Sequence, residues 1–318
     1  MFRTILVPLD GSARAERALP AAVALAKAGH GSITLVTATR EPRPMGAAGA
    51  ATTIDTRTAD ELSAAAYLDE VAARQELAGI ETRTLVRPGS PAALVLDAID
   101  DLHADLVVIC RHGQTALTRW ALGNVAEKVA RHSAAPVLLL HESGPTLFGV
   151  SDHHTPGALI PLDGSSLAQE ALNPAAQLVC ALAQPGAAAL HLSHVVTSAE
   201  EDIQYGDAAT LDAAGGRALR DTFLRHADTL RQPGLEVSWS VLHQRDVARS
   251  IVETAEGHPP QGPQGPDFSH SERPRAWDVI ALTTYGEGGA QRWSVGSVAG
   301  RVLHTTQLPM LIVRPSAQ

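Results

Sequence analysis

The sequence predicts an α/β protein made of two tandem, doubly wound domains, each with a parallel sheet flanked by helices. Three observations support this prediction: the two halves repeat one another, strand and helix patterns alternate within each half, and the strands are continuous apolar runs. A strand such as Leu106–Ile109 is typical of a parallel sheet that helices cover on both faces. The length of 318 residues accommodates two ordinary domains.

The repeat is visible at the beginning and at the end of each half. The opening ILVPLDGS at 5–12 returns as LIPLDGS at 159–165. A closing block at 111–138 returns at 284–311, with its glycines and its proline at matching positions. The two halves are therefore expected to fold alike.

The second copy is longer than the first by an internal segment. Asp163 follows Asp10 by 153 positions, whereas Gly286 follows Gly113 by 173 positions, so additional residues lie between these points in the second half. The segment 257–275, GHPPQGPQGPDFSHSERPR, has the Pro, Gly and Gln bias of a flexible chain. We expect it to be a disordered surface loop.

The expected elements alternate in both halves. In the first half we expect strands at 2–8, 33–38, 81–87, 105–110 and 137–140, and helices at 13–28, 59–78, 91–102 and 124–132. In the second half we expect strands at 158–162, 189–196, 236–242, 278–283 and 310–313. The domains are predicted at 1–142 and 156–318, joined by a linker at 143–155 that contains Gly144 and Pro145.

Composition excludes several classes of function. A net charge of −9 without a basic stripe argues against binding to nucleic acid or to an anionic membrane. No secretory signal or membrane-spanning run is recognised, so a cytoplasmic protein is expected. Cys110 and Cys180 lie in apolar surroundings and are expected to be buried, and His153 and His154 lack further ligands at metal-site spacing.

Asp10 and Asp163 follow the first strand of each half, and each is followed by Gly-Ser. In an open parallel sheet, ligands bind outside the carboxyl ends of the strands. A carboxylate there can accept a hydrogen bond from a ribose or a base. The residues leave a second interpretation open, in which each aspartate only caps the following helix.

Paired glycines follow the fourth strand of each half, where glycine allows close approach of the backbone to a ligand. The second glycine of each pair opens a helix whose N–H groups and dipole can hold a phosphate, assisted by the Ser297 hydroxyl or the Asn124 amide. The glycines are Gly113 and Gly123 in the first half and Gly286 and Gly296 in the second.

The openings quoted above, with the closing blocks GNVAEKVARHSAAPVLLL and GSVAGRVLHTTQLPMLIV, resemble the universal stress protein family along both halves. The resemblance implies a five-stranded parallel sheet in 3-2-1-4-5 order and, in ATP-binding members, a Gly-x2-Gly-x9-Gly-Ser/Thr pattern. The first copy departs from this pattern at Cys110 and Asn124, and the second departs only at Thr283. The second half is therefore the better candidate for an ATP site.

The resemblance also implies which residues surround a nucleotide, namely ATP with or without Mg²⁺. In the first half these are Pro8, Leu9, Asp10, Ala38, Ile109, Cys110, His112, Gly113, Gly123, Asn124 and Val125. In the second half they are Pro161, Leu162, Asp163, Val195, Leu282, Thr283, Tyr285, Gly286, Gly296, Ser297 and Val298. For His112 and Tyr285, filling of a loop is an equally open interpretation.

Three functional hypotheses remain. The first is a regulatory protein that binds adenine nucleotide without rapid turnover; the others are a slow ATP hydrolase and an interaction module that has lost nucleotide binding. No general base, P-loop or Gly-x-Ser-x-Gly turn lies near the glycines, which favours the first. The resemblance implies that the halves pair through their last strands, 137–140 and 310–313, and leaves a homodimer and a signalling partner open.

Overall fold

The computed structural model describes residues 1–40, 50–111, 124–145, 147, 154–183, 186–197, 214–258, 267–268, 275–284 and 297–315. The chain divides into two compact units, Met1–Phe148 and Gly149–Gln318. The division falls inside the predicted linker, 143–155. Within the described residues, none of the helices is long and apolar enough to cross a membrane.

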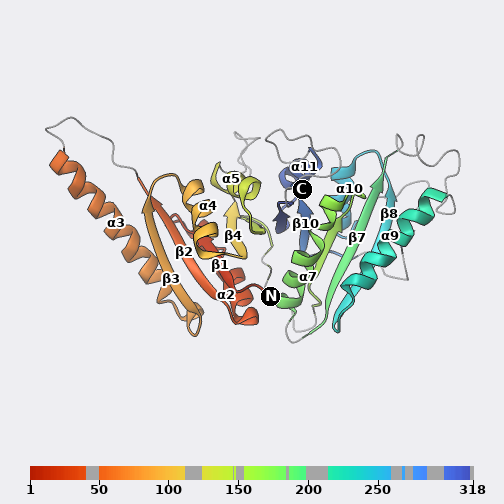
Figure 1. Cartoon of the computed structure of the whole chain (residues 1–318), viewed down its shortest axis with the longest axis horizontal. Coiled ribbons are helices and arrows are strands. Elements are labelled where there is room, and N and C mark those ends of the chain that lie inside the picture. Colours follow the sequence, from red (N-terminus) through yellow and green to blue (C-terminus); the bar gives the residue numbers. More distant parts are fainter. Residues whose placement is uncertain are drawn as a thin grey trace. The chain divides into compact units, whose positions relative to one another are not determined.

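The first unit is a parallel five-stranded sheet in the order β3-β2-β1-β4-β5, with helices packed against it (Figure 1). Its strands are β1 (Thr4–Pro8), β2 (Ser32–Thr39), β3 (Glu81–Pro88), β4 (Leu106–Arg111) and β5 (Val137–His141). Its helices are α1 (Ala13–Glu16), α2 (Leu19–Gly29), α3 (Ala50–Ala72), the short 3₁₀ helix η1 (Gln75–Leu77), α4 (Pro91–Leu102) and α5 (Asn124–His132). The predicted strand order 3-2-1-4-5 is confirmed.

The second unit repeats this order as β8-β7-β6-β10-β11, also parallel. Its strands are β6 (Gly157–Pro161), β7 (Ala188–Val196), β8 (Leu235–His243), β10 (Val279–Thr283) and β11 (Met310–Val313). Its helices are α6 (Ser166–Gln169), α7 (Leu172–Leu182), α9 (Ala214–Leu230), α10 (Val247–Ala255) and α11 (Ser297–Thr305). The strands β4, β5, β10 and β11 are buried along their whole length, as the apolar runs predict.

The predicted helix at 13–28 is wrong in its middle, because the chain forms α1 and α2 with a turn between them. Pro20 is the second residue of α2 and has no N–H, so the Glu16 carbonyl cannot receive the usual helical bond from it. Pro174 near the start of α7 likewise has no N–H to donate, and a turn separates α6 from α7 in the same way. The long helix α3 also begins earlier than predicted, at Ala50 instead of residue 59.

The prediction that 257–275 is a disordered loop is wrong in part, because this segment contains a short strand. Asp267–Phe268 forms β9, which pairs antiparallel with Val241 and Ser240 of β8. The edge of a sheet offers unpaired N–H and C=O groups, and a passing segment can satisfy them without strong β propensity of its own. Most of the remaining segment, 259–266 and 269–274, lies outside the described residues.

An aspartate at the start of the fourth strand holds the first strand of each unit. The Asp105 carboxylate accepts the backbone N–H groups of Arg3 at 2.7 Å and Thr4 at 3.1 Å. In the second unit, Asp278 accepts the N–H of Gly157 at 2.7 Å. The two aspartates lie at equivalent places in the repeat, so this connection between distant parts of each half is kept.

The cores of the two units differ at one equivalent position, which is Thr34 in β2 and His191 in β7. These residues pair in register with Leu6 and Leu159 of the central strands β1 and β6. The His191 ring is 4% exposed and stacks on Trp277 with centroids 5.2 Å apart. Its Nδ1 and Nε2 lie 2.9 and 2.8 Å from the hydroxyls of Ser238 and Ser240. Burial, with a smaller contribution from Arg275, lowers the pKa of His191 to about 4.

The two cysteines differ in burial. Cys110 at the end of β4 is buried, as expected, and burial raises the pKa of its thiol to about 11. Cys180 in α7 is only partly buried, and the Gln232 side-chain amide donates to its sulfur at 3.2 Å. The expectation that both thiols are fully buried is therefore wrong for Cys180, because it lies near the end of its helix.

Candidate functional site

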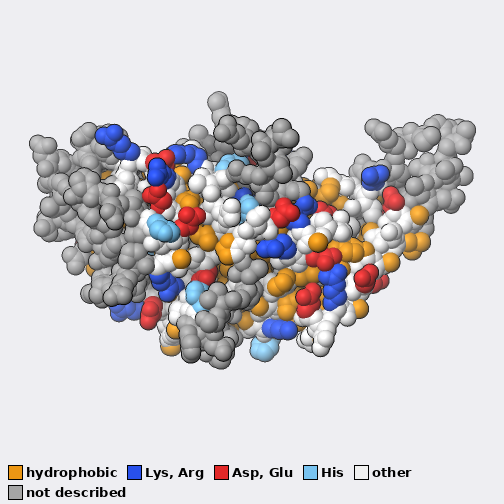
Figure 2. All heavy atoms as spheres, turned by 180° about the vertical axis from the view of Figure 1, so that it is seen from behind, with side chains coloured by type: hydrophobic (Ala, Val, Ile, Leu, Met, Phe, Trp, Pro, Cys, Tyr) orange, Lys and Arg blue, Asp and Glu red, His pale blue; other side chains and the backbone are white. Residues whose placement is uncertain are grey.

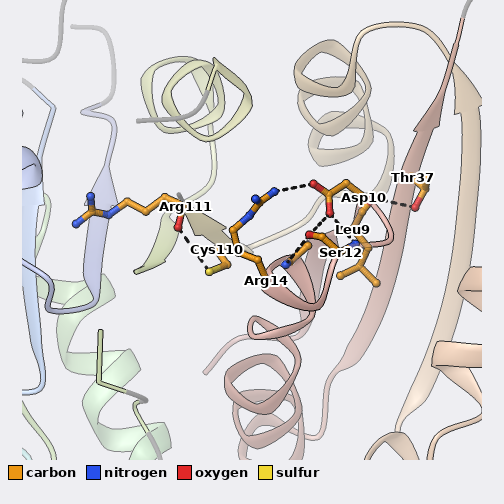
Figure 3. A network of polar contacts seen from close by, with 8 residues as sticks. Leu9, Asp10, Ser12, Arg14, Thr37, Cys110 and Arg111 are labelled. Atoms are coloured by element: carbon orange, nitrogen blue, oxygen red, sulfur yellow. Dashed lines mark hydrogen bonds and ion pairs between the residues drawn. The ribbon is translucent and has the colours of Figure 1, made fainter. Parts of the chain in front are cut away.

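The loop after the first strand has the same internal geometry in both units. In the first unit, Asp10 Oδ1 accepts the N–H of Ser12 at 3.0 Å and its hydroxyl at 2.5 Å (Figure 3). The Ser12 hydroxyl oxygen in turn accepts the N–H of Ala15 at 3.2 Å and caps α1. Gly11, between the two, has a φ of +80°, which favours glycine.

In the second unit, Asp163 Oδ1 accepts the N–H of Ser165 at 3.0 Å and its hydroxyl at 2.6 Å. Ser165 then caps α6 through the N–H of Ala168 at 3.1 Å. The interpretation that each aspartate caps the following helix is therefore wrong, because the serine is the cap in both units. Each carboxylate holds that serine in place and remains at the carboxyl end of the central strand.

The charge around the two aspartates differs. Arg14 donates to Asp10 Oδ2 at 2.8 Å, and Figure 3 shows its guanidinium directed at that carboxylate. The position equivalent to Arg14 in the second half is Leu167, which has no charge. Because 55% of the Asp10 side chain is exposed, solvent screens this ion pair. A cation nevertheless stands beside the first carboxylate and is missing at that position of the second unit.

Leu9 and Leu162 are tied to the neighbouring strand by two hydrogen bonds each. Their N–H groups donate to the carbonyls of Val36 and Ser193, both at 2.8 Å. This extends the ladder by one residue beyond Pro8 and Pro161, which have no N–H to donate. The loop that carries each aspartate is thereby fixed to two strands of the sheet.

A side chain from the neighbouring strand supplies the second bond. The Thr37 hydroxyl donates to the Leu9 carbonyl at 2.9 Å, and His194 Nδ1 donates to the Leu162 carbonyl at 2.8 Å. Since a carbonyl can only accept, the proton of His194 lies on Nδ1. Sequence reasoning named the adjacent residues Ala38 and Val195 and missed these two, although alternation along a strand separates neighbours onto opposite faces.

The ends of the fourth strands are buried in both units. Ile109, Leu282 and Thr283 are all buried, in keeping with the apolar pattern of β4 and β10. Arg111 ends β4 and is also buried, which lowers its pKa to about 10 and leaves it protonated at neutral pH. Figure 3 shows its side chain directed away from Asp10. Sequence reasoning missed this cation, although a charge ends the run LVVICR.

The helices that follow the glycine loops begin with different charges. Helix α11 begins at Ser297, which is exposed, and its first turn has no acidic residue. Helix α5 has Glu127 in its first turn, paired with Arg131, and the equivalent position in α11 is Gly300. A negative charge in the first turn competes with an anion for the positive end of the helix dipole. The two helix starts therefore differ in the charge that they would present to an anion.

The structure places part of the predicted site. Pro8, Leu9, Asp10, Pro161, Leu162, Asp163, Ala38 and Val195 lie at the carboxyl ends of neighbouring strands, and Ser297 and Val298 open α11. Val125 lies at the start of α5, as does the backbone of Asn124. The predicted residues His112, Gly113, Gly123, Tyr285, Gly286 and Gly296 and the side chain of Asn124 lie outside the described residues.

No metal centre is found within the described residues, where no group of three or more His, Cys, Asp or Glu side chains is placed to hold an ion. His154 Nε2 lies 2.6 Å from Asp278 Oδ1, the aspartate that also holds Gly157. This contact gives His154 a structural partner, and His153 lies outside the described residues.

Comparisons with known proteins identify a family for this chain. Residues 1–141 match the model of the universal stress protein family. A universal stress protein of Thermus aquaticus is 33% identical over 144 residues, which cover 44% of this chain and 99% of that protein. A universal stress protein of Mycobacterium tuberculosis is 23% identical over 218 residues, covering 67% of this chain and 63% of the relative's length.

Solved structures also match nearly the whole length of the chain. The crystal structure of a universal stress protein from Archaeoglobus fulgidus aligns with a TM-score of 0.68 at 18% identity. The alignment covers 98% of both chains. At this identity the likeness establishes a shared fold along both halves.

Proposed function

Because the chain belongs to the universal stress protein family, we propose that it is a stress-response protein that binds ATP or a related adenine nucleotide without rapid turnover. The proposed site lies at the carboxyl ends of the strands, where open parallel sheets bind ligands. Occupancy of the second unit is proposed to be stronger than that of the first.

The observation that carries the proposal is the start of α11. Its first turn presents backbone N–H groups, the exposed Ser297 hydroxyl and no acidic side chain. These groups suit a phosphate, because the helix dipole places partial positive charge at this end. Asp163, fixed through Ser165, stands at the same edge of the same sheet and suits a ribose hydroxyl.

The apolar strand ends suit the remaining part of a nucleotide. Leu162 directly follows β6, and Val195 lies near the end of the neighbouring strand β7. Both side chains are buried and offer apolar contact to a flat base. A Mg²⁺ ion would be held mainly by the phosphates, since the described residues include no metal-binding cluster of their own. The sequence around the glycines contains no P-loop and no Gly-x-Ser-x-Gly turn, which supports the proposal of slow or absent turnover.

The direct test is to identify the nucleotide that the protein retains. The freshly purified chain is denatured to release bound small molecules. Mass spectrometry is expected to detect an adenine nucleotide among them in a sub-stoichiometric or stoichiometric amount. Equilibrium dialysis with labelled ATP is expected to show binding at millimolar concentration. Absence of adenine nucleotide in both measurements would overturn the proposal and leave an interaction module as the better reading.

The rate of ATP turnover distinguishes a nucleotide-binding protein from an ATP hydrolase. ATP incubated with the protein and Mg²⁺ is expected to remain largely intact over minutes, as measured by release of inorganic phosphate. Many turnovers per minute, lost in Asp163→Ala, would favour the ATP hydrolase over the binding protein.

A further inference from the structure

The opposite edge of the first sheet, where the strands begin, contains a pocket of about 470 Å³. It lies between the starts of β1, β2 and β3 and the end of α2, far along the strands from Asp10. In Figure 2, basic and histidine side chains stand next to one another at the lower edge, the side on which Figure 1 places the N-terminus. A pocket of this volume accommodates a small molecule.

The pocket has a rigid backbone frame. The N–H of Ser32 donates to the Arg3 carbonyl at 2.7 Å, and a Cβ on Gly31 would lie only 2.7 Å from that same oxygen. A Cβ on Gly29 would lie 2.1 Å from the Phe2 carbonyl oxygen. The two glycines therefore permit the end of α2 to lie directly against the first strand, and this contact fixes the residues that surround the pocket.

Three basic residues surround the opening: Arg3, Lys27 and His30. All three are exposed, and within the described residues none of their side chains has an ion pair or hydrogen bond. His30 ends α2 with a φ of 49°, a left-handed conformation that turns the chain into β2. Lys27 and His30 at the end of α2 also complement the helix dipole, whereas Arg3 lies outside the helix and the dipole does not account for it.

The one carboxylate of the pocket is already neutralised. Glu81 Oε1 accepts two hydrogen bonds from the Arg83 guanidinium, at 2.6 and 3.1 Å. The free charges around the pocket are therefore positive, in a chain whose net charge is −9. A concave site with charges of one sign concentrates small ions of the opposite sign.

The second unit keeps the backbone bond of this frame, since the Ala189 N–H donates to the Pro156 carbonyl at 2.9 Å, but it has Leu182 in place of Gly29 and lacks the basic residues. Gly79 lines the pocket with a φ of +81°, and Gly234 has the same φ before β8. The positions equivalent to Arg3, Lys27 and His30 are Pro156, Cys180 and Ala183, of which Ala183 ends α7 as His30 ends α2. The basic residues are therefore not required by the fold, since the same fold forms without them.

We propose that this pocket of the first unit binds a small anion of the phosphate class that carries several negative charges. Arg3 supplies a planar fork for two phosphate oxygens, Lys27 a mobile point charge and His30 a ring N–H donor. The pocket lies at the opposite edge from the proposed nucleotide site and does not depend on it.

Lys27 provides a local readout, because Lys27 and Lys128 are the two lysines of the chain and both are exposed. The full chain is acetylated briefly with an amine-reactive ester, with and without inorganic tripolyphosphate, and the modified peptides are quantified by mass spectrometry. At a tripolyphosphate concentration ten times its Kd, the acetylation rate of Lys27 is expected to fall about tenfold, with Lys128 as the reference.

Two variants separate the site from general charge effects. Arg3→Gln is expected to remove the protection of Lys27 while leaving ATP binding in equilibrium dialysis unchanged, which distinguishes this proposal from the nucleotide site. Arg231→Gln, which removes one exposed cation from the second unit, is the matched control and is expected to retain protection. Unchanged acetylation of Lys27 in the wild-type chain, or equal protection in Arg3→Gln, would overturn the proposal. Equal protection by citrate at the same ionic strength would overturn its phosphate class.

Discussion

The two carboxyl edges of the molecule share a frame and differ in charge. Both aspartates hold the serine that caps the next helix, and both loops are tied to the neighbouring strand. Around this frame the first unit has Arg14 and Glu127, where the second has Leu167 and Gly300. Duplication has therefore kept the hydrogen bonds that shape the loop, while the groups that would meet a ligand have diverged.

The largest expected effect tests which unit binds nucleotide. Asp163→Ala removes an acceptor proposed for the ribose and is expected to weaken ATP binding about 10- to 100-fold, the range for a hydrogen bond to a charged group. Asp10→Ala is the matched control, with the same loss of the serine contact. Isothermal titration calorimetry measures both, and a larger loss in Asp10→Ala would reverse the assignment.

The buried His191 is expected to make the second unit sensitive to acid. Its folded-state pKa of about 4 lies below the ordinary 6.5, so the unfolded chain takes up the proton first as pH falls. The contribution of the neutral, buried His191 to the free energy of unfolding is fully present above about pH 6.5 and is lost as the pH falls from 6.5 to 4. At pH 5 this corresponds to a loss of about 2 kcal/mol.

Urea unfolding followed by tryptophan fluorescence measures this loss at pH 7.5 and pH 5. His191→Thr, which introduces the residue found at Thr34 of the first unit, is expected to flatten the pH dependence even if it lowers stability at both pH values. If His191→Thr loses as much unfolding free energy between pH 7.5 and pH 5 as the wild type does, groups other than His191 cause the acid sensitivity.

A charge exchange between the helix starts is expected to have a smaller effect. Gly300→Glu introduces the acid of the first unit into α11 and is expected to weaken ATP binding about 2- to 5-fold, since it opposes phosphate at the positive end of the helix. Gly300→Gln controls for the added side chain. In the opposite direction, Glu127→Gln is expected to strengthen binding at the first unit, and equilibrium dialysis measures both changes.

The smallest expected effect concerns the ion pair beside Asp10. Arg14→Leu copies the second unit and is expected to lower the unfolding free energy by less than about 1 kcal/mol, because the carboxylate is half exposed. Leu167→Arg is the reciprocal variant and is expected to change stability as little. Chemical denaturation measures both, and a loss above about 2 kcal/mol in Arg14→Leu would mean that the pair is more important than its exposure indicates.

The sequence predicts the strands, their order by resemblance, and the aspartate loops, because apolar runs and repeats are local signals. The break before Pro20 is also visible in the sequence, but only once the missing N–H is considered. Thr37 and His194 were missed, since their role depends on a carbonyl of another strand. The burial of Arg111 depends equally on tertiary packing, which a single sequence does not display.

The bonds from Asp105 and Asp278 to the first strands have a consequence for how each half is made. Thr4 is joined to a residue 101 positions later, and Gly157 to one 121 positions later. During synthesis, the central strand of each sheet can therefore form this contact only after most of its half has left the ribosome. Because closure entropy grows with the logarithm of loop length, the longer span adds only about 0.2 kcal/mol, so an insertion at this place is thermodynamically cheap.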